Sequence, residues 1–151
     1  MHHKGFTLLE LVTVLILIGI LSAIAIPAFH NIHTEARIKA TFQEMKELQK
    51  AIMGDSEFRG YMQDVGALPT NLSDLYGAQA GGYNPFLQTG GSRGGYISDV
   101  DGDGNGVADI LEDAWGHPYA WDSATGVLYS FGPNGSNDGG GGDDIVLDVD
   151  G

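Results

Sequence analysis

Residues 6–29 read FTLLELVTVLILIGILSAIAIPAF, and this stretch decides how the rest of the chain can be organised. From Leu11 to Phe29 it holds no ionisable side chain. About 20 apolar residues in a helix cross a bilayer core of about 30 Å, because a helix satisfies its own backbone hydrogen bonds. The stretch therefore predicts a single membrane-spanning helix near the start of the chain.

One carboxylate interrupts this apolar stretch, at Glu10. A carboxylate well inside a membrane costs roughly 2.5–3.5 kcal/mol on insertion scales, and such an acid indicates a function. The alternative is that Glu10 lies among the lipid headgroups of an ordinary signal anchor. The residues before the stretch, MHHKG, form a short basic leader. A secretory signal peptide has its cleavage site after the apolar run, whereas here the small residue, Gly5, precedes it.

The run Gly5-Phe6-Thr7-Leu8-Leu9-Glu10 closely resembles the class III signal of type IV pilins and pseudopilins. The resemblance implies that a prepilin peptidase cuts between Gly5 and Phe6 and methylates the new N-terminal amine of Phe6. The family's acidic residue is the fifth of the mature chain and its helix-kinking proline is the twenty-second, which are Glu10 and Pro27 here. It also implies that Glu10 pairs with the N-terminal amine of a neighbouring subunit during filament assembly. A buried charge is tolerated only with such a partner.

Charge is unevenly distributed along the chain. The net charge is -13, all seven Lys and Arg lie at or before Arg93, and 12 of the 20 Asp and Glu lie from Asp99 onward. A nucleic-acid partner is disfavoured, because phosphate binding relies on Lys and Arg. The chain has no cysteine and therefore no disulfide. The clustered carboxylates favour bound cations, and a self-repelling acidic tail is the alternative.

Beyond the apolar stretch, the pattern predicts an α+β domain. Apolar residues recur near a period of 3.6 and predict that the helix continues to Met53-Gly54; they are Ile38, Phe42, Met45, Leu48 and Ile52. Pro27 should kink this helix or break it over a turn. Short β-type runs cover residues 119–121, 127–131 and 145–149, with a turn at Gly126. We expect a small antiparallel sheet packed on the helix.

The segments between the helix and the sheet are less regular. Residues 54–66 suit a loop or a short helical stretch, and residues 68–75 suit a turn into a short helix with Thr70 or Asn71 as its N-cap. Residues 77–95 hold seven glycines and predict an irregular loop.

Residues 101–112 match the 12-residue calcium loop D-x-[DN]-x-[DN]-G-x5-E at every fixed position. Calcium binds six to eight oxygens at about 2.3–2.6 Å. The expected ligands are the side chains of Asp101, Asp103, Asn105, Asp109 and Glu112 and the carbonyl of Val107. No entering helix is evident, so the prediction is an EF-hand-like loop rather than a paired sensor EF-hand. A flexible acidic turn is the alternative.

A second loop, from Ser130 to Ile145, spaces polar side chains with glycine. The spacing of these side chains alone fits a solvated loop as well as it fits a cation-binding loop. Together with Asp113-Ala114-Trp115-Gly116-His117-Pro118-Tyr119, it resembles the C-terminal third of the major pseudopilin of type II secretion, which binds one structural calcium. The implied ligands are the Phe131 carbonyl and the side chains of Asn134, Ser136, Asp138, Asp143 and Asp144. Ala114 and Asn134 depart from the family's Pro and Asp, and the 101–112 loop is an insertion that the family does not require.

The resemblance implies a structural subunit of a pilus-like filament, namely the major pseudopilin of a type II secretion system, stabilised by one or two Ca²⁺. Its parts would be a leader (1–5), a transmembrane and filament-core helix (6–29) and a periplasmic domain (30–151). It would be a single-pass inner-membrane protein before assembly. Its partners would be its own copies, the prepilin peptidase, an inner-membrane assembly platform and minor pseudopilins.

Two other functions stay open. One is a major or minor pilin of a surface type IV pilus, serving adhesion or motility. The other is a membrane-anchored calcium-binding protein that never polymerises. The sequence holds no catalytic constellation, so an enzyme is not expected. His117 lies in the turn Trp115-Gly116-His117-Pro118 and has no second His or Cys nearby in the sequence. This favours a surface or packing role over metal binding.

Overall fold

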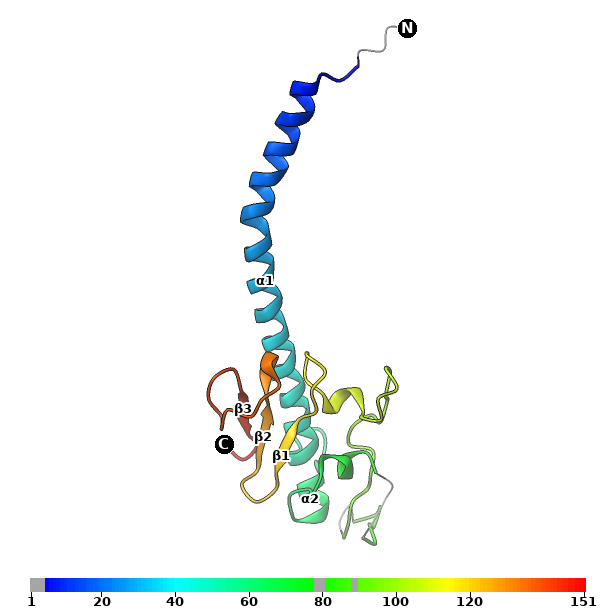
Figure 1. Ribbon diagram of the computed structural model, residues 1–151. Helices are drawn as coiled ribbons and strands as arrows, with labels where there is room; N and C mark the ends of the chain where they lie inside the picture. Colours follow the sequence, from blue (N-terminus) through cyan, green and yellow to red (C-terminus); the bar gives the residue numbers. More distant parts are fainter. Residues whose placement is uncertain (1–4, 78–80, 88–89) are drawn as a thin grey trace. The chain divides into compact units, whose positions relative to one another are not determined.

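The computed structural model describes residues 5–77, 81–87 and 90–151 (Figure 1). The α+β class predicted from the sequence is confirmed. In chain order the helices are α1 (Leu8–Met53) and α2 (Tyr61–Val65), followed by the 3-10 turns η1 (Leu72–Leu75) and η2 (Asp109–Leu111). The strands are β1 (Ala120–Asp122), β2 (Val127–Ser130) and β3 (Ile145–Asp148), and a third 3-10 turn, η3 (Gly132–Asn134), lies between β2 and β3. The chain divides into two compact units, Met1–Ala36 and Arg37–Gly151.

The first unit contains the apolar part of α1. Among the described residues, one segment is long and apolar enough to cross a membrane, Leu8–Ala25, with a mean hydropathy of 2.6. None of that segment is buried within the protein. α1 continues through residue 27 as one helix, so of the two outcomes predicted for Pro27 the break over a turn does not occur, and the kink stays a prediction. A proline removes one backbone donor from a helix interior, and the remaining turns of α1 keep the helix continuous.

The second unit has its core on one face of α1. Met45, Leu48 and Ile52 are fully buried, as the periodicity predicts. Ile38 and Phe42 are 41% and 43% exposed, so their predicted core position is wrong. The domain covers α1 only from Thr41 onward, and the Thr41 hydroxyl accepts a hydrogen bond from the backbone N–H of Ala114 at 3.1 Å. Ile38 lies about one turn before the covered part, and Phe42 lies at the edge of the covered face.

The sheet has the strand order β1-β2-β3, and both pairs are antiparallel. Leu128 of β2 pairs with Leu147 of β3, and both side chains are buried in the core. Gly126 closes the β1–β2 hairpin with φ +71°, where its N–H donates to the Asp122 carbonyl at 2.9 Å. The predicted strands agree with the observed ones to within one residue at each end.

The connections between α1 and the sheet follow the predicted outline. α1 ends at Met53, and Gly54 adopts φ +81°, which is the usual role of glycine at a helix end. α2 lies within the predicted 54–66 segment, and Asn71 is the N-cap of η1. The described residues of the 77–95 loop contain no helix or strand.

A buried ion cluster, which the sequence reading missed, ties two of these connections together. The side chain of Asp64 in α2 is fully buried and contacts Arg59 Nε at 2.8 Å and Arg93 Nε at 3.6 Å. It also accepts a hydrogen bond from the Tyr96 hydroxyl at 2.8 Å. A buried carboxylate needs such partners, so this cluster joins the segment after α1 to the end of the glycine-rich loop.

Candidate functional site

The N-terminal site lies at the start of α1. Gly5 and Phe6 precede the helix and are exposed, so the peptide bond between them lies outside the helix. The backbone N–H of Glu10 donates to the Thr7 hydroxyl at 3.2 Å, and Glu10 Oε2 lies 3.5 Å from the Thr7 backbone nitrogen. This is the reciprocal pattern of a capping box. Within one chain, Glu10 thus caps the first turn of α1 and remains exposed to a further partner.

Thr7 is a participant that the sequence reading did not single out. The signature of a capping box, Ser or Thr followed three residues later by Glu or Gln, is present in Thr7-Leu8-Leu9-Glu10. The sequence therefore carries the signal for this capping role of Thr7.

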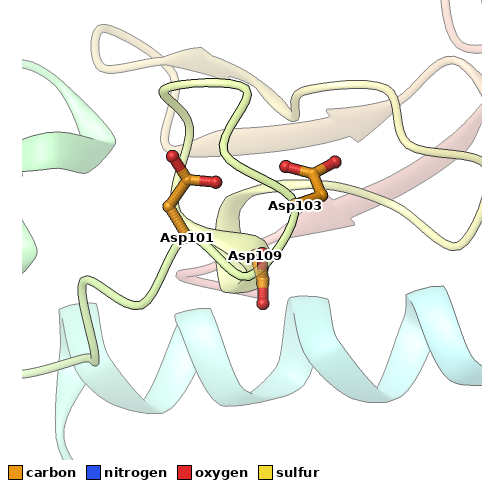
Figure 2. A group of neighbouring side chains, drawn as sticks. All are labelled: Asp101, Asp103 and Asp109. Atoms are coloured by element: carbon orange, nitrogen blue, oxygen red, sulfur yellow. The ribbon is translucent and has the colours of Figure 1, made fainter.

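The first acidic loop brings three of its predicted ligands together (Figure 2). Carboxylate oxygens of Asp101, Asp103 and Asp109 all lie within 4.8 Å of one another, and all three residues are exposed. Asp101 accepts N–H bonds from Gly104 at 2.7 Å and Gly106 at 2.9 Å. The bond from Gly106 is the main cause that holds the pKa of Asp101 below its usual value. The charged form of this carboxylate is therefore favoured in the folded loop.

Asn105 and Glu112 lie next to these carboxylates. The Asn105 amide Nδ2 donates to Asp103 Oδ2 at 3.1 Å and to Glu112 Oε1 at 2.9 Å. Its Oδ1 accepts the N–H of Val107 at 2.8 Å. Glu112 is 8% exposed, at the end of η2. The donor set is all oxygen and suits a hard cation such as Ca²⁺, but Asn105 would have to turn its amide over to present Oδ1 to the ion.

The second acidic loop is also held by its own hydrogen bonds. Asn134 Nδ2 donates to Asp138 Oδ2 at 3.1 Å and to Asp143 Oδ1. Asp144 Oδ2 accepts the N–H groups of Asp138 and Gly140, each at 2.9 Å. Asp144 Oδ1 is buried and has no hydrogen-bond partner among the described residues. An orphaned carboxylate oxygen of this kind is what a bound cation would satisfy.

The other residues predicted for the second loop lie around this network. Phe131 is the N-cap of η3, which begins at Gly132. The backbone N–H of Ser136 donates to Asn134 Oδ1 at 2.6 Å. Gly132 approaches the Asp143 carbonyl so closely that a Cβ at this position would clash with it. The loop is therefore closed tightly at its base, as a small-ion site requires.

His117 joins this loop to the preceding turn. Its Nδ1 lies 3.0 Å from the Gly132 carbonyl, and its ring lies against Gly135. Asp113, which is fully buried, accepts the backbone N–H groups of Trp115 and His117 at 3.0 Å each and the Ser130 hydroxyl at 2.6 Å. These contacts give His117 the packing role predicted for it and hold the 113–117 turn against the end of β2.

Comparison with known proteins identifies the N-terminal segment. The prokaryotic N-terminal methylation motif matches residues 1–26. The N-terminal region of this chain is type IV pilin-like. The chain is 43% identical over 50 residues to the type IV major fimbrial protein FimA of Dichelobacter nodosus. It is likewise 43% identical over 50 residues to the fimbrial protein EcpB of Eikenella corrodens and to a fimbrial protein of Moraxella nonliquefaciens.

The similarity to these fimbrial proteins covers only a part of each chain. It covers 33% of this chain and 31–32% of these relatives, so the chain spans about a third of the length of the curated relatives it matches. No solved structure matches the type IV pilin-like chain at a significant level. The domain that follows the apolar helix, with its two acidic loops, therefore rests on its own sequence and structure.

Proposed function

We propose that the type IV pilin-like chain is a structural subunit of a pilus-like filament. The observation that carries this proposal is the N-terminal site: the Gly5-Phe6 bond precedes α1, and Glu10 follows at the fifth position after the cut. The apolar surface of Leu8–Ala25 is unburied within one chain and needs either lipid or other copies of the helix to cover it. The similarity of 50 residues of the chain to fimbrial proteins supports the same function.

Within this function, we propose the major pseudopilin of a type II secretion system, held in the inner membrane before assembly with its domain in the periplasm. The support is the resemblance of the run from Asp113 to Tyr119 and of the glycine-rich loop to that family. A pilin of a surface pilus is the second candidate, because the named relatives are fimbrial proteins. A strain lacking the gene should lose export of a secreted protein in the first case and surface pili in the second.

The first test is the mass of the mature protein purified from its native membrane. A chain that begins at Phe6 and carries one added methyl group is the expected result. An intact Met1 start would contradict the filament proposal and favour a plain membrane anchor. The mass can be read without any knowledge of the secretion system or of bound ions.

The assembly role of Glu10 is tested by Glu10→Leu, with Glu35→Leu as the matched control. Both glutamates are exposed on α1, but Glu35 lies outside the apolar segment. We expect Glu10→Leu to abolish filaments seen by electron microscopy, because it removes the partner of the N-terminal amine. Glu35→Leu should assemble. Normal filaments with Glu10→Leu would rule out the proposed pairing.

We further propose that both acidic loops hold Ca²⁺, which would neutralise their carboxylates and cross-link each loop. Asp101, Asp103, Asp109 and Glu112, the Asn105 side chain and the Val107 carbonyl would hold the first ion. Asn134, Ser136, Asp138, Asp143 and Asp144 with the Phe131 carbonyl would hold the second. Calorimetric titration should show two equivalents. Asp109→Asn should remove one of them and Asp144→Asn the other, whereas an unchanged stoichiometry in either variant would contradict the assignment of that loop.

A further inference from the structure

Each acidic loop contains one Asn-Gly step, Asn105-Gly106 and Asn134-Gly135. The remaining asparagines are followed by Ile, Leu, Pro and Asp. Both Asn105 and Asn134 are exposed. A following glycine matters because it has no Cβ, so its backbone nitrogen is the least hindered nucleophile that a chain offers. The two sites therefore combine a reactive sequence with access to solvent.

We propose that Asn105 and Asn134 are sites of spontaneous deamidation, and that the hydrogen bonds of each loop set the rate. In the reaction the glycine nitrogen attacks the asparagine Cγ and forms an N–Cγ bond. The Cγ–Nδ2 bond breaks, and the proton lost from the glycine N–H leaves with Nδ2 as ammonia. The product is a succinimide. Water then opens either of its two C–N bonds, which yields aspartate or isoaspartate.

The structure restrains all three groups that must move. In both loops Oδ1 of the asparagine accepts the N–H two residues on, from Val107 at 2.8 Å and from Ser136 at 2.6 Å. In both loops Nδ2 donates to two carboxylates. The glycine N–H that must be lost is also a donor in each case. A folded loop therefore fixes the carboxamide and retains the proton, and the reaction requires these bonds to open.

The two sites are restrained unequally. The Gly106 N–H donates to the Asp101 carboxylate at 2.9 Å, whereas the Gly135 N–H donates to the Gly132 carbonyl at 3.2 Å. A hydrogen bond to an ionised acceptor is stronger than one between neutral groups. Asn134 should therefore react before Asn105 in the folded chain.

Deamidation changes what each loop can hold together. The asparagine Nδ2 now donates to Asp103 and Glu112 in one loop and to Asp138 and Asp143 in the other. The product has a carboxylate in that place, which repels its neighbours, and isoaspartate also lengthens the backbone by one methylene. In a loop without a bound cation the reaction therefore loosens the loop in which it occurs, and its extent records the age of the subunit.

The test follows the full-length protein in detergent and mildly alkaline buffer, with a chelator present so that the result is independent of calcium binding. Peptide mass mapping over time reads the two sites separately. In the unmodified chain Asn134 is expected to convert first. Faster conversion of Asn105, equal rates at the two sites, or no conversion at either site even in urea would overturn the proposal.

Variants test the restraint, and each loop serves as the control for the other. Asp101→Ala should speed conversion of Asn105 about tenfold, which corresponds to about 1.4 kcal/mol, without changing Asn134. Asp143→Ala should speed conversion of Asn134 without changing Asn105, because Asp143 accepts hydrogen bonds from both the backbone N–H and the Nδ2 of Asn134. Equal rates of conversion in the variant and the unmodified chain would show that these hydrogen bonds do not set the rate. If a variant unfolds, the proposal can still be refuted, because the order in which the two sites convert is measured in the unmodified chain.

Gly106→Ala tests the chemistry itself. An added Cβ at Gly106 meets open space, so its effect is on the backbone at φ +90° and on the attacking nitrogen. We expect conversion of Asn105 to fall sharply in urea, where folded-state strain is absent, while Asn134 converts as before. An undiminished rate at Asn105 would exclude attack by the nitrogen of residue 106.

Discussion

At the scale of single residues, the buried carboxylate of Asp113 connects two parts of the second unit. It accepts hydrogen bonds from the Ser130 hydroxyl and from two backbone N–H groups of its own turn. The turn carries His117, which in turn contacts the base of the second acidic loop at Gly132. The position of that loop thus depends on a residue that is not among its predicted ligands.

Asp113→Ala should lower the free energy of unfolding by about 3 kcal/mol, because three donors lose a buried, charged acceptor. Asp150→Ala is the matched control, since Asp150 is exposed, and should change it by less than about 0.5 kcal/mol. Urea unfolding of the full-length protein, followed by tryptophan fluorescence, measures both. Equal losses in the two variants would show that Asp113 does not connect the turn to β2.

Asp101 makes the first acidic loop sensitive to acid. Because the Gly106 N–H favours its charged form, the pKa of Asp101 is lower in the folded loop than in the unfolded chain. Its stabilising contribution is therefore fully present above the ordinary Asp pKa of about 3.9, and it is lost as pH falls through the lower folded-state pKa. The amide resonance of Gly106 should titrate below about pH 3.9. Asp101→Asn should abolish this titration, and a midpoint above that value would contradict the assignment.

At the scale of elements, α1 from Arg37 onward presents one face to the core and the rest to solvent. Thr41, Met45, Leu48 and Ile52 follow one another at intervals of four, three and four residues and are fully buried. An interval of this kind keeps side chains on one face of a helix. The sheet and the 3-10 turns supply the other side of the same core.

Leu48→Ala should cost about 2–5 kcal/mol of unfolding free energy, since it removes a fully buried side chain. Ile38→Ala, on the partly exposed flank of the same helix, should cost less than about 1 kcal/mol. Thermal unfolding of the full-length protein followed by circular dichroism compares the pair. A loss at Ile38 as large as that at Leu48 would mean that the buried face is misassigned.

The close approach of β2 and the second acidic loop depends on Gly132. Gly132→Ala should add a steric clash with the Asp143 carbonyl, worth about 1–3 kcal/mol, to the cost of a left-handed backbone at φ +61°. Gly139→Ala has a similar φ of +69° and open space around its Cβ, so it isolates the backbone cost. Proteolysis should therefore cleave the Gly132→Ala variant faster than the Gly139→Ala variant. Equal susceptibility would show that the base of the loop is looser than the structure indicates.

At the scale of the whole molecule, a net charge of -13 opposes a compact domain, and calcium would relieve this repulsion. Each occupied site should add about 2.7 kcal/mol at a free calcium concentration a hundredfold above its dissociation constant. We expect the melting temperature of the full-length protein to rise with calcium and to fall with chelator. The loop variants Asp109→Asn and Asp144→Asn should each lose part of the rise, whereas Asp150→Asn should keep it. Equal melting temperatures in calcium and chelator would reduce both loops to solvated turns.

The features of the molecule whose signals are local in the sequence were predictable. Hydrophobicity from Leu11 to Phe29 predicts the membrane-length helix, and the run from Gly5 to Glu10 predicts the pilin-like N-terminus. Strand runs and turn glycines also predicted the sheet to within a residue, because alternation and left-handed turns depend on near neighbours. The ligand list of the 101–112 loop likewise follows from spacing within 12 residues, and three of its carboxylates do converge.

Contacts between distant segments were decided only by the tertiary structure. Thr41 is buried where Ala114, 73 residues away, donates to its hydroxyl, whereas Ile38, one turn earlier, and Phe42 stay partly exposed. Nothing in the sequence indicated that Asp64 and Asp113 are buried. Their roles depend on which donors and acceptors the fold brings to them, since a polar side chain is buried only where partners compensate its lost hydration. The sequence by itself determined the membrane-length apolar helix, the strands and the composition of the loops, and the packing of remote segments determined which side chains hold the loops in place.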